Sequence, residues 1–193
     1  MKYEKIVQLK NGKELLIRSG READGEAVAE NFNETHAETD FLLAYPDEHR
    51  MTGEQEAAFL KAREESETEA LLVAEIDGKI VGTAGLDALG NRFKLKHRAE
   101  FGIGISKAYW GMGIGTCLMK ACIELAEQAG YEQLELSVVA DNERAVQLYK
   151  TAGFTEFGCN PKGFRSRTAG YQPLLMMRLE LNGGGSAGKD SER

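Results

Sequence analysis

Apolar and polar positions alternate, as along a half-buried β-strand, in two pairs of short segments in the first half of the chain. The pairs are 5–9 with 14–19 and 70–76 with 79–86. Asn11-Gly12 lies within the first pair and Asp77-Gly78 within the second. Because such dipeptides favour two-residue hairpin turns, the pattern predicts two β-hairpins.

Between these hairpins the pattern becomes polar and helical, from Arg21 to about Ser66. It is interrupted near Tyr45-Pro46 and at Gly53, and proline and glycine are the residues that most often end a helix. The segment therefore predicts two or three short helices.

The second half of the chain alternates between strand and helix patterns. The predicted elements are a strand over 92–106, a loop over 107–113, a helix over 113–128, a strand over 133–139, a helix from Asn142 to Gly153, and strands over 154–157 and 171–181 joined by a loop. Apolar positions in 113–128 recur at intervals of three and four residues, and Gly130 is a natural helix stop.

This order of elements predicts an α/β (α+β) fold with a mixed central sheet of about six to seven strands flanked by about four helices. The strand, helix and strand around 107–113 predict one parallel pairing in an otherwise largely antiparallel sheet. We expect residues 1–181 to form a single domain. Residues 182–193 are rich in Gly and Ser and have almost no apolar side chain to dock, so we expect a disordered tail.

The charge of the chain argues against several classes of function. A net charge of −7 disfavours nucleic acid as a partner, because phosphate binding rests on clustered Lys and Arg. No apolar run is long enough to cross a membrane, and no signal-sequence core is present, so we expect a cytoplasmic protein with no membrane partner. The cysteines and histidines lack metal-ligand spacing, and no metal is predicted.

Acidic residues are concentrated in one segment. Residues 19–69 contain far more Asp and Glu than Lys and Arg. If this segment walls a binding site, it favours a cationic ligand over an anionic one. The alternative is a solvated helical surface.

Three glycines at alternate positions, Gly111, Gly113 and Gly115, stand where the strand pattern gives way to the helix pattern. Without Cβ atoms, their peptide N–H groups can turn toward an anion, and the following helix adds the positive end of its dipole. A Walker loop would need a lysine after the last glycine, and a Rossmann fingerprint would need a glycine where Thr116 stands. The glycines therefore predict a pyrophosphate cradle of another type.

Two segments resemble the central motifs of the GNAT N-acetyltransferase superfamily. The family's loop has Gln or Arg, two residues, Gly, any residue, and Gly or Ala, and its later helix has Asn, two residues, Ala, then Leu-Tyr and Gly-Phe. The matching residues are Trp110-Gly111-Met112-Gly113-Ile114-Gly115 and Asn142, Ala145, Leu148-Tyr149 and Gly153-Phe154. Trp110 departs from the family's Gln or Arg, and we interpret it as a packing residue rather than a ligand contact. The resemblance is strong over residues 70–157.

The resemblance implies an acetyl-CoA site built mainly from main-chain groups. The implied residues are Ile103, Gly104 and Ile105 on a strand, Gly111, Met112, Gly113, Ile114, Gly115 and Thr116 in the loop and the start of its helix, and Asn142 at the later helix. In this family the strand separates from its neighbour and bonds the pantetheine arm. Glycines inside an apolar strand are consistent with such a close approach.

Glu100 and Tyr149 are the candidate catalytic residues. Glu100 lies where many family members keep a general-base glutamate, and the alternative is a glutamate paired with Arg98 or Lys96. A carboxylate entering a buried strand has a raised pKa and can take a proton from an ammonium group. Tyr149 matches the tyrosine that the family is proposed to use to protonate the CoA sulfur, and the alternative is an aromatic side chain packed on the sheet.

Together these features predict an acetyl-CoA-dependent N-acetyltransferase. Its acceptor would be a primary amine of a positively charged small molecule or peptide, which attacks the thioester directly in a ternary complex. The same cradle would also suit a non-catalytic acyl-CoA-binding sensor or regulatory module, or a nucleotide-binding protein. The closing strands offer an edge on which a homodimer could form.

Overall fold

The computed structural model describes residues 1–48 and 50–181, so the tail predicted at 182–193 lies outside the described residues. The helices and strands over this part of the chain are β1 (Glu4–Gln8), β2 (Glu14–Ser19), α1 (Gly25–Glu38), α2 (Gly53–Glu65), β3 (Ala70–Ile76), β4 (Lys79–Ala88), β5 (Arg98–Ile105), α3 (Ile114–Gln128), β6 (Gln133–Val139), α4 (Glu143–Thr151), β7 (Thr155–Ser166) and β8 (Gly170–Glu180). Short 3-10 turns at Glu22–Asp24 and Lys107–Tyr109 precede α1 and α3.

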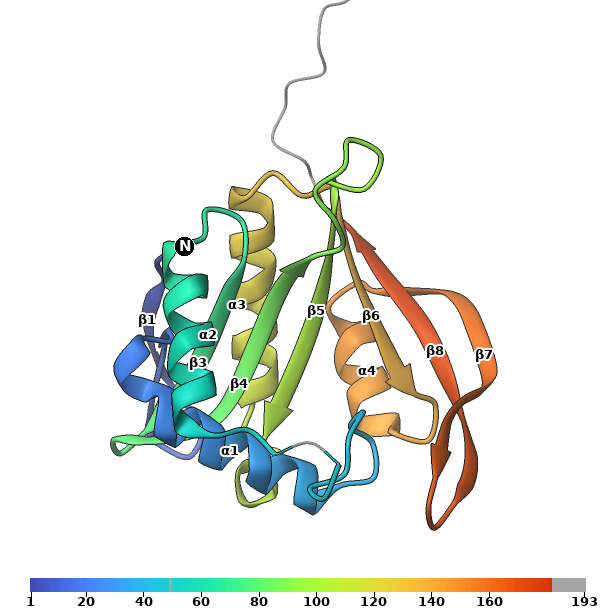
Figure 1. Ribbon diagram of the computed structural model, residues 1–193, viewed down its shortest axis with the longest axis horizontal. Coiled ribbons are helices and arrows are strands. Elements are labelled where there is room, and N and C mark those ends of the chain that lie inside the picture. Colours follow the sequence, from blue (N-terminus) through green and yellow to red (C-terminus); the bar gives the residue numbers. More distant parts are fainter. Residues whose placement is uncertain (49, 182–193) are drawn as a thin grey trace, which may run out of the picture.

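The strands form one mixed sheet in the order β1-β2-β3-β4-β5-β6-β8-β7 (Figure 1). Every neighbouring pair is antiparallel except β5 and β6, which are parallel. The mixed sheet, its single parallel pairing and the four α-helices expected from the sequence are confirmed in the described part of the chain. The sheet has eight strands there, slightly more than the six or seven expected.

Two pairs of helices cover the two faces of the sheet (Figure 1). One face, called here the α3–α4 face, carries the larger core, in which α3 contributes the fully buried Leu118 and Leu125. The other, the α1–α2 face, carries a smaller core that includes Val28 and Leu60. Full burial of one such side chain stabilises the fold by about 1.5–3 kcal/mol.

The helix boundaries follow from local chemistry. α3 begins after its N-cap residue Gly113, whose backbone is in the left-handed region. The helix ends before Gly130, which has a φ of +80°. α2 begins at Gly53, where the sequence pattern is interrupted, because Thr52 and Gln55 form a reciprocal capping box. Of the two or three short helices predicted between Arg21 and Ser66, two α-helices are present, α1 and α2.

Residues 92–97 were predicted as strand, and this prediction is wrong. They form turns in which the N–H groups of Leu95 and Lys96 both bond to the Arg92 carbonyl. β4 and β5 are adjacent and antiparallel, so the chain must reverse between them, and these residues make the reversal. The alternation of apolar and polar residues does not indicate a strand here, because Phe93 has no sheet to pack on and is 82% exposed.

The loop predicted between the two closing strands is also mostly strand. β7 continues through Gly158, Pro161 and Gly163 to Ser166, although these residues usually interrupt a strand. Register shifts beside Gly158 and between Asn160 and Phe164 absorb the irregularity. Pro161 falls in the unpaired stretch between Asn160 and Phe164 of this edge strand, so its missing N–H costs no ladder bond.

Candidate functional site

The site begins where β5 and β6 separate. The two strands pair only from Arg98 to Glu100 on β5, and beyond this point no pairing joins them. The Ser106 N–H bonds to Val81 on β4. Because main-chain groups of successive strand residues point to opposite sides, those of Ile103 and Ile105 point away from β4, into the gap toward β6.

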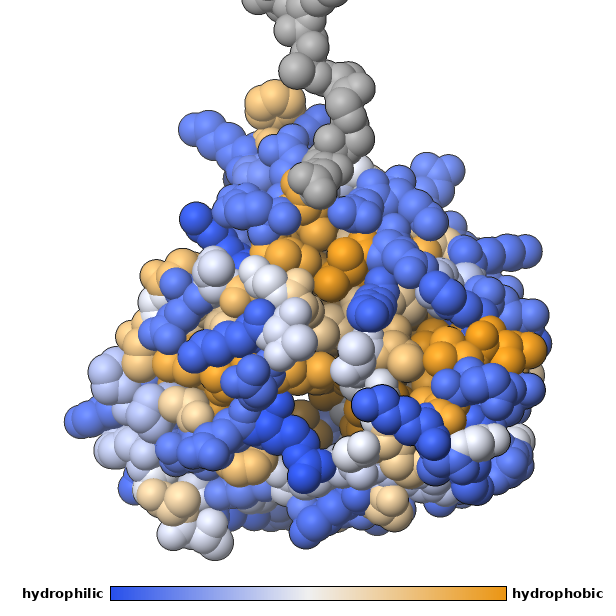
Figure 2. Space-filling model, turned by 180° about the vertical axis from the view of Figure 1, so that it is seen from behind, coloured by the Kyte–Doolittle hydropathy of each residue, from blue (hydrophilic) through white to orange (hydrophobic). Residues whose placement is uncertain are grey.

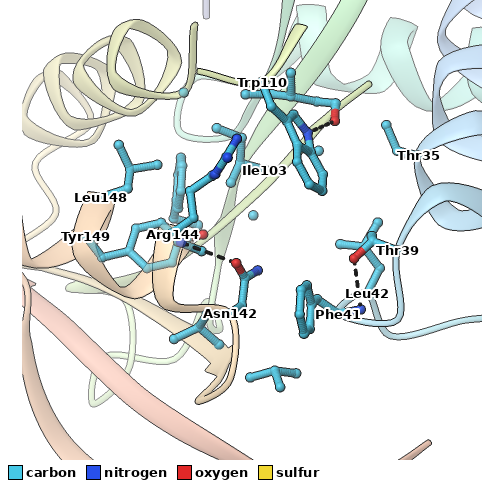
Figure 3. Close-up of a pocket in the computed structure, with 18 of the residues that line it drawn as sticks. Thr35, Thr39, Phe41, Leu42, Ile103, Trp110, Asn142, Arg144, Leu148 and Tyr149 are labelled. Carbon is cyan, nitrogen blue, oxygen red and sulfur yellow. Dashed lines mark hydrogen bonds between the residues drawn. The ribbon is translucent and has the colours of Figure 1, made fainter. Parts of the chain in front are cut away.

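A cavity of about 1020 Å³ fills this gap and extends to both faces of the sheet. All the residues predicted for the acetyl-CoA site line it except Met112, whose side chain packs against the core. Glu100 and Tyr149 line it as well. Figure 3 shows Thr39, Phe41 and Leu42 on one side of the cavity, facing α4 across it, and Figure 2 shows a hollow on the α3–α4 face.

The glycine loop presents free main-chain N–H groups to the cavity. Gly111 and Gly113 have φ angles of +79° and +89°, which L-residues rarely adopt. A Cβ atom added to either would meet nothing within 4 Å, so the space above both is open. Within the described ranges, no N–H from Gly111 to Thr116 has a main-chain partner, because the first ladder bond of α3 comes from Cys117 to Gly113. The loop is therefore a concave surface of unsatisfied donors, which suits an anion.

Trp110 is held by the strand that precedes the loop. Its indole Nε1 donates a hydrogen bond of 2.6 Å to the Ile105 carbonyl. The guanidinium of Arg144, at the start of α4, lies 5.2 Å from the centre of the indole ring. The indole N–H is thus committed to the main chain, and Arg144 is the only basic side chain lining the cavity among the described residues.

Asn142 caps α4 at the border of the cavity. Its side-chain oxygen accepts from the Ala145 N–H at 3.3 Å, so the N-cap expected from the sequence is present. The amide nitrogen of the same side chain makes no hydrogen bond within the described residues. It is a donor directed to the site that a ligand carbonyl can use.

Glu100 lies on the α1–α2 face of the sheet and carries no ion pair with any described residue. Arg98, one of its two expected partners, instead donates hydrogen bonds from Nε and Nη2 to the Glu135 carboxylate. Glu100 is in register with Asp87 on β4 and with Glu135 on β6. Desolvation and then the charges of these two carboxylates raise the pKa of Glu100.

Asp87 is a site residue that the sequence analysis missed. It lines the cavity beside Glu100, and Arg63 on α2 bridges it to Glu69. Burial raises the pKa of Asp87, although Arg63 opposes the shift. No sequence motif marks Asp87, because its place opposite Glu100 depends on the register of β4 against β5.

Tyr149 sits deep in the cavity wall and is 7% exposed. Its ring packs edge-on against Phe101 and, tilted, against Phe154. Its hydroxyl makes no hydrogen bond within the described residues, and burial raises its pKa to about 12. The phenol therefore stays protonated at neutral pH and is available as a proton donor.

The segment between α1 and α2 walls the cavity, but not with its acidic side chains. Its lining residues are Thr39, Phe41, Leu42 and Leu43, and Thr35 on α1 lines the cavity next to them. No carboxylate of the described residues within 19–69 lines the cavity, which agrees with the alternative of a solvated surface; the lining carboxylates come from β4, β5 and residues 141 and 143 beside the start of α4. The spacing of apolar residues along a helix cannot predict this lining, because the apolar residues lie in an irregular loop.

The same segment is tied to the turn between β7 and β8. The Ser166 hydroxyl donates to Asp40, and the Arg167 N–H donates to the Tyr45 hydroxyl at 2.9 Å. The Arg167 guanidinium also pairs with Asp47 at 2.7 Å and lies over the Tyr45 ring. These contacts join residues more than 110 positions apart and close one side of the cavity.

Among the described residues, no group of three or more His, Cys, Asp or Glu side chains is placed to hold a metal ion. None of the described helices is long and apolar enough to span a bilayer.

Comparison with known proteins gives consistent matches. The model of the acetyltransferase (GNAT) family matches residues 30–154. An L-amino acid N-acetyltransferase of Escherichia coli is 35% identical over 92 residues, which are 47% of this chain and 56% of that relative. The chain thus spans little more than half the length of this curated relative.

Solved structures match over more of the chain. A GNAT-family acetyltransferase from Streptococcus pneumoniae superimposes with a TM-score of 0.81 at 30% identity, covering 86% of this chain and 99% of that one. A protein from Salmonella typhimurium, solved with its cofactor acetyl-CoA, superimposes with a TM-score of 0.78 at 21% identity, covering 91% and 98%. The second match concerns the fold alone.

Proposed function

The chain belongs to the GNAT family of acetyltransferases, and from this premise we propose that it transfers an acetyl group from acetyl-CoA to a primary amine. The proposal rests on one observation, which is that two structural features line the same cavity. One is the row of unsatisfied N–H groups from Gly111 to Thr116, and the other is the gap between β5 and β6.

The residues present fit acetyl-CoA. The open space above Gly111 and Gly113 admits a diphosphate to hydrogen-bonding distance of the loop N–H groups, which a Cβ atom would obstruct. Arg144 would add a positive charge at this end of the cavity. The main-chain groups of Ile103 and Ile105, and the free amide nitrogen of Asn142, would hold the amide-rich pantetheine arm as a neighbouring strand would.

Glu100 is the proposed general base and Tyr149 the proposed general acid. Glu100 would take the proton of the incoming ammonium group, directly or through a water, and leave a neutral amine that attacks the thioester. An unpaired N–H on the open side of β5 would donate to the thioester oxygen as negative charge develops there. As the C–S bond breaks, the Tyr149 hydroxyl would protonate the departing thiolate, and the second proton of the attacking nitrogen would restore the phenol. Acetyl-CoA supplies the activated acyl group.

Acceptor-dependent release of CoA thiol tests the proposed function. The purified protein is mixed with acetyl-CoA and a panel of primary amines, and free thiol is measured over time. We expect release that depends on both protein and amine. Calorimetric binding of acetyl-CoA without release by any amine would instead favour the non-catalytic acyl-CoA sensor. Binding of ATP or NAD but not of CoA would favour a nucleotide-binding protein.

Glu100→Gln is expected to lower kcat/KM by on the order of a hundredfold or more, the usual contribution of a positioned base. In the wild type, kcat/KM should fall with decreasing pH as Glu100 is protonated, at a pH above the ordinary glutamate pKa because its pKa is raised. The variant should lose this limb of the profile. Steady-state rates from pH 5 to 9 measure both.

Glu156→Gln serves as the matched control, because Glu156 is an exposed glutamate on β7 that carries no ion pair with a described residue and does not line the cavity. Thermal stability gives a second readout. A carboxyl whose pKa is raised by folding destabilises the fold above that pKa, so Glu100→Gln should melt at a higher temperature than wild type at pH 7 but not below pH 4. Equal turnover of Glu100→Gln and wild type would remove the base assignment.

A further inference from the structure

The part of the cavity that lies on the α1–α2 face, called here the acceptor chamber, has a distinct chemical character. Side chains of β5 alternate, so Glu100, Gly102 and Gly104 face this side, whereas Ile103 and Ile105 face α3 and contact Gly115. A Cβ atom added to Gly102 would meet nothing within 4 Å, which leaves open space in front of Glu100. A ligand on this side reaches the gap between β5 and β6 from the face opposite the glycine loop.

The charged groups of the acceptor chamber are carboxylates. Asp87 and Glu100 lie side by side on β4 and β5, and no basic side chain of the described residues lines the chamber with them. Arg144 belongs to α4, on the other face, and is stacked on Trp110. A ligand here meets a negative field with no fixed cation to bind an anionic substituent.

The nearby guanidinium groups on this face are already paired. Arg63 bridges Glu69 and Asp87, Arg98 bonds to Glu135, and Arg178 bonds to Glu180. None of these three arginines lines the cavity. Even when these arginines are counted, the net charge around Glu100 is negative, because Glu100 has no counter-ion among the described residues.

The walls of the acceptor chamber are apolar. Phe41 and Leu42 come from the segment after α1, and Phe164 and Leu174 come from β7 and β8. The bonds of Asp40 and Tyr45 to residues 166 and 167 hold these two walls together. A chamber with apolar walls and two carboxylates selects a ligand with a cationic head and a carbon body.

We infer that the acceptor is a primary amine on an apolar carbon body that carries no carboxylate beside the amine. The inference rests on the proposed function and names its acceptor class. An amine without a neighbouring carboxylate places its ammonium group at Glu100 and Asp87 and its carbon body against the apolar walls. An α-amino acid would bring its carboxylate to the same two carboxylates, and like charges brought together disfavour binding.

This acceptor class differs from that of one relative. The E. coli protein described above is named for L-amino acids. A free α-amino group is a weaker base than an alkylamine, so at one pH a larger fraction of an amino acid is neutral and reactive. Basicity alone therefore favours the amino acid over an alkylamine, and a preference for an alkylamine would have to come from the site.

Thiol release with three matched acceptors tests the inference. L-Phenylalanine, L-phenylalaninamide and phenethylamine share one carbon body but differ in the basicity of the amine as well as in charge, so each kcat/KM is calculated for the concentration of the neutral amine. For the wild-type protein we expect kcat/KM for the amide and for phenethylamine to exceed that for phenylalanine at least tenfold. Equal or faster reaction of phenylalanine would overturn the inference and leave the proposed function standing. If none of the amines caused thiol release, the proposed function and the inference would both be overturned.

Ser137→Arg gives a second, independent test. Ser137 is exposed on β6, faces the acceptor chamber, and its hydroxyl makes no hydrogen bond with a described residue, so the substitution should not disturb the fold. The added guanidinium would partner an acceptor carboxylate. We expect the ratio of kcat/KM for phenylalaninamide over phenylalanine to fall at least fivefold, and Ser137→Gln, the uncharged control, to leave it unchanged. An unchanged ratio in Ser137→Arg would contradict the electrostatic basis of the inference.

Discussion

Gly113→Asp is expected to weaken the binding of acetyl-CoA by at least a hundredfold while the protein stays folded. Gly113 has a φ of +89° at the start of α3, and Asp is one of the few residues that adopt this conformation at modest cost. Its carboxylate would occupy the open space of the cradle and repel the diphosphate. Loss of about 2.7 kcal/mol corresponds to a hundredfold, and like charges at an interface cost several kcal/mol. Titration calorimetry measures the affinity.

Gly130→Asp is the matched control for this experiment. Gly130 stands at the other end of the same helix with a φ of +80°, and a Cβ atom there also meets nothing within 4 Å. The same substitution therefore imposes similar backbone strain away from the cradle. We expect it to lower the melting temperature and to leave the affinity for acetyl-CoA unchanged. Equal affinities of the two variants would show that the loop does not bind the diphosphate.

Tyr149→Phe is expected to lower kcat by on the order of a hundredfold, with the affinity for acetyl-CoA unchanged. A positioned proton donor contributes this much or more to a transfer step. Phenylalanine keeps the packing of Tyr149 on Phe101 and Phe154. The lost hydroxyl has no hydrogen-bond partner within the described residues, so the fold should not be weakened. Pre-steady-state thiol release isolates the chemical step.

Tyr131→Phe controls for removal of a buried phenol. Tyr131 is 3% exposed and packs in the core, but it does not line the cavity. We expect its substitution to change stability more than turnover. If Tyr149→Phe turned over as fast as wild type, Tyr149 would be an aromatic side chain packed on the sheet, the alternative that its sequence position leaves open.

Local chemistry accounts for the elements that the sequence predicted well. Asp77-Gly78 closes its hairpin with both residues at positive φ, whereas in Asn11-Gly12 only Gly12 has a positive φ and the Leu9 N–H bonds to the Lys13 carbonyl around a three-residue loop. The glycine loop could be located because positive φ angles, such as those at Gly111 and Gly113, strongly favour residues without a Cβ atom. Such features depend on a few consecutive residues.

The errors arise where distant segments decide the outcome. Residues 92–97 alternate like a strand, but the pairing of β4 with β5 requires a reversal there. Residues 158–166 contain Gly and Pro like a loop, but β8 offers them a ladder, and β7 forms beside it. In both places tertiary pairing outweighs local preference, because each ladder bond depends on a partner far along the chain.

The sequence by itself determined the secondary-structure order, the glycine loop and the candidates Glu100 and Tyr149. Only the tertiary structure decided that Glu100 lies without a counter-ion beside Asp87, that Arg98 turns to Glu135, and that a loop after α1 walls the cavity. The physical reason is the distance along the chain over which the interactions act. Turn and helix signals are set by neighbours within four or five residues, whereas the charge and shape of the site are set by strand register and by contacts between segments more than 100 residues apart.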